Sequence, residues 1–116
     1  MMKRKPWRSK AYAKWVRSLP CSACGTTEGV VAHHIKGIWH LSGAGLKAPD
    51  SFLMPLCDGP GDTCHRKAHN EAWMRNLQPT FLRWTLHKGL ETFDGEVREQ
   101  LTHALAFVEA KEGEMA

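Results

Sequence analysis

The stretch CDGPGDTCHRKAH, residues 57–69, combines two cysteines and two histidines with a run of turn-forming residues. The glycines and the proline between the two cysteines predict a wide turn. Asp62 or Thr63 can cap a helix that we expect over residues 63–75. On this helix the two histidines lie four residues apart, so both rings occupy one face and can bind one ion.

Two further cysteines lie in the motif CSAC, so the chain holds two cysteine pairs separated by 32 residues. Two short turns that each present two thiolates favour a tetrahedral zinc site, of the structural kind in which protein fills all four positions. The N-terminal MMKRKPWRSK lacks the apolar core of a secretory signal, so we expect the reducing cytoplasm. Buried free thiols and two disulfides in a secreted protein are the alternatives. The four candidate zinc ligands are Cys21, Cys24, Cys57 and Cys64.

Another histidine pair lies in VVAHHIKG, residues 30–37, which has the character of a short strand. Neighbouring residues on a strand point to opposite faces, so His33 and His34 are poor candidates for equivalent ligands of one ion. We expect one ring to bind a metal and the other to act as an acid or base. The remaining histidines are treated as structural: His40, His87 and His103.

The length of 116 residues and the hydrophobic content of 42% fit one small domain. No run of eighteen apolar residues predicts a membrane span. The expected elements, in order, are a helix over 8–19, a strand over 29–35, a loop over 37–51, a short apolar run over 52–56 that Pro55 limits to an edge or a strand end, the helix over 63–75, a helix from Pro79 that ends before Gly89, and a helix over 95–111.

The net charge of +4 is unevenly distributed. The first twenty residues contain seven basic side chains and no acid. With Trp7, Tyr12 and Trp15 among them, this arm favours a polyanionic partner, and a solvated helix face is the alternative.

The motifs CSAC, AHHI, MPLC and CHRKAH, in this order, resemble the HNH endonuclease superfamily, the His-Me finger nucleases with a ββα-metal fold. They are similar to the zinc-knuckle members of phages and prophages, which include recombination-enhancement nucleases. The matching stretch covers residues 19–70. The resemblance implies a small α+β protein with a basic arm and helix over 1–20, a zinc-stabilised core over 21–76, and a C-terminal helical extension over 77–116.

The resemblance also assigns roles to individual residues. It implies that His34 is the general base that activates water, and that His33, His65 and His69 bind the catalytic divalent ion. That ion would be Mg²⁺ or Mn²⁺, with Zn²⁺ and Ni²⁺ as further candidates. The cysteines match the structural zinc site. The residues expected to hold the DNA backbone are Lys3, Arg4, Lys5, Arg8, Lys10, Lys36, Lys47, Arg66 and Lys67.

The chain departs from the family pattern at its middle residue, an asparagine that steadies the general base. The only asparagines, Asn70 and Asn76, come too late. Asp50 is the nearest polar candidate, because its carboxylate can accept a hydrogen bond from an imidazole. The alternative is a plain turn residue after Pro49.

The resemblance therefore implies a metal-dependent endonuclease that hydrolyses DNA phosphodiester bonds. DNA is the expected partner, held through its phosphates, and a second copy of the chain or a phage or host recombination protein is a further candidate. The alternative function is a catalytically inactive, zinc-finger-like DNA-binding module.

Overall fold

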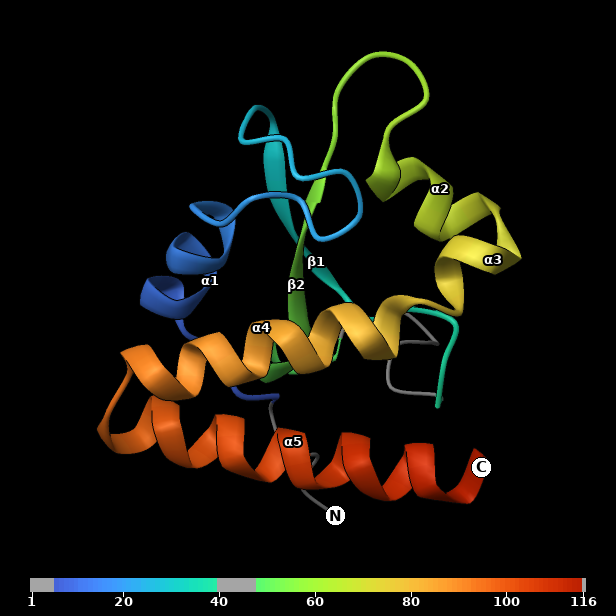
Figure 1. The fold of residues 1–116 in the computed structure, drawn as a ribbon. Coiled ribbons are helices and arrows are strands. Elements are labelled where there is room, and N and C mark those ends of the chain that lie inside the picture. Colours follow the sequence, from blue (N-terminus) through green and yellow to red (C-terminus); the bar gives the residue numbers. More distant parts are fainter. Residues whose placement is uncertain (1–5, 40–47, 116) are drawn as a thin grey trace.

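The computed structural model describes residues 6–39 and 48–115, and it has an α+β architecture. A two-stranded antiparallel sheet is combined with helices that precede and follow it (Figure 1). The elements, in chain order, are α1 (Lys10–Arg17), β1 (Val30–His34), the short 3₁₀ helix η1 (Asp50–Phe52), β2 (Leu53–Cys57), α2 (Cys64–Asn70), α3 (Ala72–Arg75), α4 (Gln78–Thr92) and α5 (Gly95–Met115).

The sheet pairs the two apolar segments that the sequence predicts as strands. In its register Ala32 lies opposite Pro55, and His33 lies opposite Met54. Pro55 has no N–H, yet β2 continues through it, because a two-stranded sheet leaves one side of each strand outside the ladder. The carbonyl oxygen of Pro55 accepts a hydrogen bond from the backbone N–H of Ser22 at 2.9 Å.

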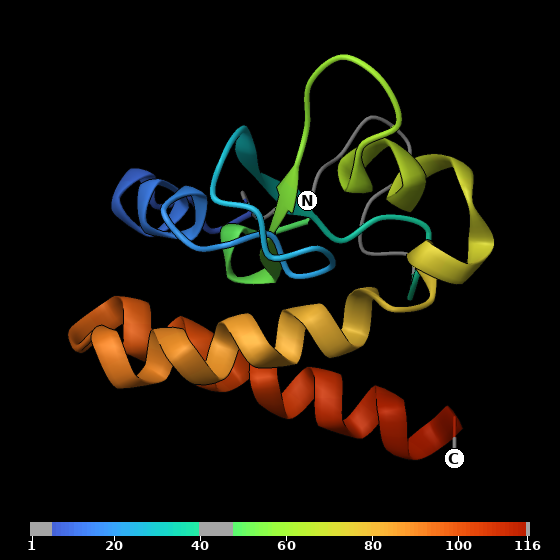
Figure 2. The ribbon, with the colours of Figure 1, turned by 45° about the horizontal axis from the view of Figure 1, so that its top comes forward.

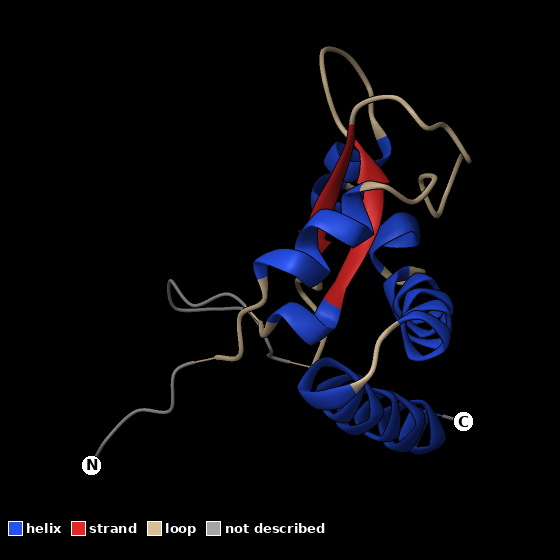
Figure 3. Cartoon of the chain, turned by 90° about the vertical axis from the view of Figure 1, so that its left-hand side faces the viewer, coloured by secondary structure: helices blue, strands red, loops and turns tan. Residues whose placement is uncertain are grey.

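The helices surround this sheet on several sides. Helix α1 lies on one side of the strands, and α2 with α3 lies on the other (Figure 1). Helix α4 crosses beneath the sheet and contacts β2, and α5 packs along α4 (Figures 1 and 2). Viewed from the α1 side, the paired strands stand behind α1, while α4 and α5 lie together as a second helical layer (Figure 3).

The hydrophobic core lies between the sheet and these helices. Its fully buried side chains include Leu53 and Leu56 from β2, Leu82 from α4 and Leu101 from α5. Helix α1 contributes Tyr12 and Val16, both fully buried.

The aromatic residues of the basic arm pack together instead of facing solvent. The Tyr12 ring contacts Trp7, Trp15 and Phe93, with ring centroids 5.5–6.2 Å apart. These rings belong to the packing between α1 and the end of α4, in which Tyr12 is fully buried and Trp7 and Trp15 are partly buried.

Several predicted helix boundaries are wrong, including that of the first helix, which was expected over 8–19 and spans Lys10–Arg17. Helix α4 was expected to end before Gly89 but continues to Thr92. Gly89 is instead a packing position, because a Cβ placed there would lie 2.6 Å from Leu101 Cδ1. The helix expected over 63–75 is divided at Glu71, whose extended backbone (φ −121°, ψ 124°) separates α2 from α3.

The last helix is longer than its sequence pattern predicts and reaches Met115 instead of residue 111. Its inner face carries the buried residues Leu101, Ala104 and Val108. Among the described helices, none combines the length and the apolar character that a membrane crossing requires.

Candidate metal centres

The four cysteines come together although they come from different parts of the chain. Their sulfur atoms all lie within 4.8 Å of one another, and no two are joined in a disulfide. Cys24 Sγ and Cys57 Sγ are 3.8 Å apart. Metal–sulfur bonds of about 2.3 Å give a tetrahedron with edges of about 3.8 Å. The group therefore fits one tetrahedral metal ion, as the cysteine spacing predicts.

Backbone hydrogen bonds shape the first of the two cysteine turns. The Gly25 N–H donates to Cys21 O at 2.9 Å, and the Cys21 N–H donates to Thr26 O at 2.9 Å. Gly25 has φ +79°, a conformation that glycine adopts without strain. The second turn is wider, because Gly59 and Gly61 both have positive φ.

The thiols of this group differ in acidity. Burial opposes ionisation of Cys21, but backbone N–H donors, led by that of Cys24, outweigh it and lower its pKa to about 7. Burial raises the pKa of Cys64 and of Cys57. Metal binding requires thiolates, so a divalent cation would stabilise the charge that the buried thiols avoid without it.

Three histidines form a second group of candidate ligands. His33 comes from β1, while His65 and His69 come from successive turns of α2, and one ring nitrogen from each lies within 4.8 Å of the others. The Nε2 atoms of His65 and His69 are 3.2 Å apart. Two nitrogens bound to one ion at about 2.1 Å lie roughly 3.0–3.4 Å apart. The predicted pairing of the strand with the helix therefore places three imidazoles where one ion can bind.

A buried glutamine that sequence reasoning missed holds His33 in place. Gln78 is fully buried, and its Oε1 lies 2.7 Å from His33 Nε2. The same Oε1 accepts from the Lys36 N–H, so it acts as an acceptor toward both groups. Nε2 of His33 then carries the proton, and Nδ1 carries the lone pair that can bind a metal. Burial is the main cause that lowers the pKa of His33 to about 4, which keeps the ring neutral.

An acidic residue supports the second histidine in a similar way. His65 Nδ1 lies 3.3 Å from Asp58 Oδ2, and the Thr63 hydroxyl donates to Asp58 Oδ1 at 3.2 Å. Asp58 follows Cys57 directly, just as His65 follows Cys64, so the wide cysteine turn delivers both partners. The backbone N–H of Gly59 is the main cause that lowers the Asp58 pKa, and His65 adds to it. Nothing in the spacing of Asp58 indicated this contact.

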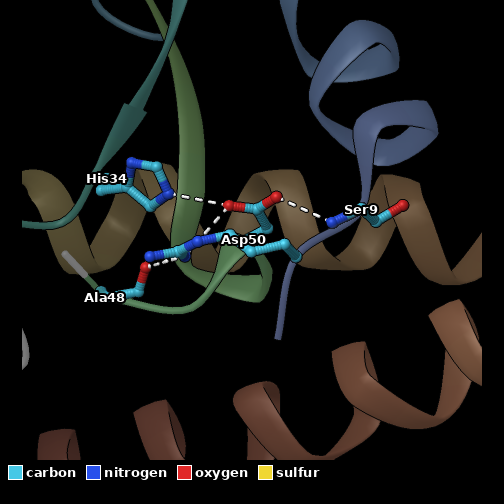
Figure 4. Close-up of polar contacts among 5 residues, drawn as sticks. Ser9, His34, Ala48 and Asp50 are labelled. Carbon is cyan, nitrogen blue, oxygen red and sulfur yellow. Dashed lines mark hydrogen bonds and ion pairs between the residues drawn. The ribbon is translucent and has the colours of Figure 1, made fainter. Parts of the chain in front are cut away.

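The neighbouring histidine, His34, contacts Asp50. Its Nε2 lies 2.9 Å from Asp50 Oδ1, and the backbone N–H of Ser9 donates to Asp50 Oδ2 at 2.8 Å (Figure 4). Arg8 donates to Asp50 Oδ1 at 3.2 Å and to Ala48 O at 2.6 Å. The Asp50 carboxylate is therefore buried among three donors, one of which is the His34 imidazole, and this is the contact that one of the two readings of the sequence predicted.

A pocket opens beside the three histidines. It has a volume of about 420 Å³. Burial is the main cause that lowers the pKa of His69, and the charges of His65, Lys36 and Arg75 add to it. The residues that line the pocket are Lys36, Gly37, Ala68, His69, Asn70 and Arg75.

The basic residues expected to hold DNA are only partly accounted for. Lys3, Arg4, Lys5 and Lys47 lie outside the described residues, as does His40. Lys10 is exposed on α1, and Lys36 lines the pocket. The others have partners within the protein: Arg8 with Asp50, Arg66 with Gly59 O at 3.4 Å and Lys67 with Asp62 at 3.8 Å.

The comparisons with known proteins give a family for most of the chain. A family described as "Protein of unknown function (DUF968)" matches residues 1–92. The chain belongs to this family. The DUF968 match includes both groups of candidate ligands, Asp50 and Gln78, and it ends before α5.

One curated relative is similar over part of its length. The "Uncharacterized protein YdfU" of Escherichia coli (strain K12) is 39% identical over 69 residues. This stretch is 60% of the DUF968 chain described here and 17% of the relative, so the match spans about a sixth of the relative's length. No solved structure matches the chain significantly.

Proposed function

We propose that this protein is a metal-dependent endonuclease that hydrolyses phosphodiester bonds in DNA. The observation that carries the proposal is the grouping of three histidine ring nitrogens, next in the chain to a histidine paired with a buried carboxylate. A grouped set of neutral nitrogen ligands and an oriented imidazole are the two components that metal-assisted hydrolysis needs.

The arrangement of elements supports the same proposal. Strands β1 and β2 are antiparallel, and α2 follows β2 directly after the second cysteine turn. The ββα-metal fold has this order, with its ligands on the first strand and on the helix. We therefore propose that residues 21–76 form a ββα-metal core, with zinc on the four cysteines as a structural ion.

The three histidines would hold the catalytic ion through His33 Nδ1 and one ring nitrogen each of His65 and His69. Gln78 and Asp58 orient two of these rings from behind. A divalent ion bound there would supply Lewis-acid stabilisation of the charge on the phosphorus oxygens and on the leaving 3′ oxygen.

His34 is the general base in this proposal. Asp50 accepts the Nε2 proton of His34, so the lone pair lies on Nδ1, and Nδ1 takes a proton from water. The resulting hydroxide attacks phosphorus, the bond to the 3′ oxygen breaks, and that oxygen takes up a proton from solvent. The negative Asp50 carboxylate stabilises the imidazolium until His34 returns its proton to water.

Charge supports a nucleic acid substrate. The chain carries a net charge of +4, and the basic residues expected to contact phosphates flank both histidine positions: Arg8 beside His34, and Lys36 beside His69. Contacts of this kind give affinity that does not depend on base sequence and that decreases with salt.

The test is cleavage of supercoiled plasmid DNA by the purified protein with Mg²⁺, Mn²⁺, Zn²⁺ or Ni²⁺, followed on agarose gels. We expect nicked or linear product in at least one of these metals and none in EDTA. His34→Ala should reduce the rate by on the order of 10²- to 10⁴-fold, the usual contribution of a general base.

The matched control is His87→Ala, which removes an exposed histidine of α4 and should leave the rate unchanged. Equal rates for His34→Ala and the unaltered protein would exclude the assigned role. Salt-sensitive DNA binding without cleavage in any of the four metals would instead favour the inactive DNA-binding module.

A further inference from the structure

We propose that the pocket lined by Lys36 and Arg75 binds one nucleotide of the polynucleotide strand, with its phosphate between these two cations. The inference rests on the proposed function, because it assigns a subsite to the same substrate. The pocket has a volume of about 420 Å³, which suits a nucleotide better than a lone ion, since sites for small organic ligands are about 300–1,000 Å³.

The charge of the lining selects an anion. Lys36 and Arg75 are both cations, and none of the described residues that line the pocket is acidic. Arg75 presents a planar fork of donors that matches two phosphate oxygens, and Lys36 adds a point charge.

Buried contacts fix the backbone of both walls. Gln78 accepts from the Lys36 N–H at 3.1 Å and donates to Lys36 O at 2.8 Å and to Arg75 O at 2.9 Å. Because this side chain is fully buried, it joins the two cation-bearing segments as one unit. The same amide holds His33, so the pocket and the candidate ligand have a common support.

A glycine makes room for the arginine. Gly37 has φ +73°, and a Cβ there would lie 2.8 Å from Arg75 Cδ. The Arg75 guanidinium donates to His69 O at 2.7 Å, at the end of α2. These contacts fix the position of the Arg75 side chain in the wall of the pocket. Its remaining N–H groups can donate hydrogen bonds to a phosphate.

The lining also includes a neutral polar group. Asn70 contributes an exposed amide that can donate to a sugar hydroxyl or a base edge. His69 is shared with the candidate metal group. The nucleotide in the pocket would therefore lie beside the phosphodiester to be cleaved.

The experiment measures binding of deoxythymidine 3′,5′-bisphosphate to the full chain by calorimetry at low salt, without added divalent ion. Inorganic phosphate and deoxythymidine are the comparison probes. We expect the bisphosphate to bind and both comparison probes to bind at least about tenfold more weakly, a difference of about 1.4 kcal/mol. Equal binding of inorganic phosphate would overturn the nucleotide assignment.

Variants locate the site. Lys36→Gln should weaken bisphosphate binding by about tenfold or more, and Lys36→Arg should largely restore it. Lys88→Gln removes an exposed cation of α4 that does not line the pocket, so it should have no effect. Equal losses of bisphosphate affinity in Lys36→Gln and Lys88→Gln would show that the binding depends only on net charge, and would overturn the proposal.

The outcome is separable from that of the nuclease test. Binding that depends on Lys36 in a protein that cleaves no DNA would support the pocket and refute the catalytic proposal. Cleavage of DNA by a protein that binds no bisphosphate would support the catalytic proposal and refute the nucleotide pocket.

Discussion

Asp50 shows how one side chain can serve folding and chemistry together. Its carboxylate accepts from the Ser9 N–H, where α1 begins, and from Arg8, and it pairs with His34. The first two contacts tie the N-terminal segment to the turn before β2. The third gives the imidazole a single orientation and tautomer, which a general base requires.

Asp50→Asn should therefore lower the rate of DNA cleavage by on the order of 10²- to 10⁴-fold while the protein remains folded. The amide keeps the shape of the carboxylate but loses the charge that stabilises an imidazolium. If its NH₂ group faces His34, it also moves the imidazole proton to Nδ1. The measurement is the cleavage rate, together with the melting temperature.

Asp62→Asn is the matched control, because Asp62 is highly exposed and contacts only Lys67 among the described side chains. Its cleavage rate should equal that of the unaltered protein. A folded Asp50→Asn variant with an unchanged rate would leave His34 without its proposed partner.

The sequence predicts these sites unevenly at the level of residues. Cysteine and histidine pairs have characteristic spacings, so the cysteine group and the pair of His65 and His69 could be predicted from the sequence. His33 was assigned to this second group only through the resemblance to the HNH endonuclease superfamily. Gln78 could not be predicted, because it lies 45 residues from His33 and belongs to no spacing rule. Asp58 was missed for a related reason, since its role depends on the path of the turn between the cysteines.

Among the helices, the contact between α4 and α5 depends on one small residue. Gly89 lies within α4, where Leu101, Tyr12 and Trp15 all approach the position that a Cβ would occupy. Glycine is a common sign of a helix end, and the sequence alone offered no reason to place it inside one. Its helical position follows from tertiary packing, which overrides local propensity.

Gly89→Ala should reduce the free energy of unfolding by about 1–3 kcal/mol, as overpacking of a core does. Leu101 is fully buried and cannot move aside without disturbing its neighbours. Urea unfolding followed by circular dichroism measures the change.

Gly113→Ala provides the comparison within α5, because no atom lies within 4 Å of a Cβ placed at residue 113. That variant should gain up to about 1 kcal/mol from helix propensity. A loss of the same size in both variants would show that the effect does not arise from the contact between the helices.

For the whole molecule, the cysteine group is the feature that connects the most elements of the fold. Its four members follow α1, end β2 and begin α2, so one ion would join three elements of the fold. In a chain of 116 residues, a metal bound only by the folded state contributes directly to folding.

Removing the metal with a strong chelator should therefore lower the melting temperature by at least about 10 °C, given the size of zinc binding energies. Metal analysis should find zinc retained in His33→Gln and lost in Cys57→Ser. An unchanged melting curve in protein shown to be free of metal would argue against a structural ion. Two distinct ions in the unaltered protein, one removed by mild chelation, would support both centres.

The α+β architecture could be predicted from the sequence, because hydrophobic periodicity and turn residues mark most elements locally. The division of α2 from α3 could not. At Glu71 the chain turns so that Arg75 can reach the carbonyl of His69, and that is a contact between turns rather than a property of the local sequence.

The proline in β2 affects the association of one molecule with another. A sheet of two strands has two outer edges, and an open edge can recruit a strand from another chain and start aggregation. On the outer edge of β2, Pro55 offers no N–H, and its carbonyl is already bonded to Ser22. That edge therefore cannot readily pair with a third strand, which protects the small sheet against aggregation at high protein concentration.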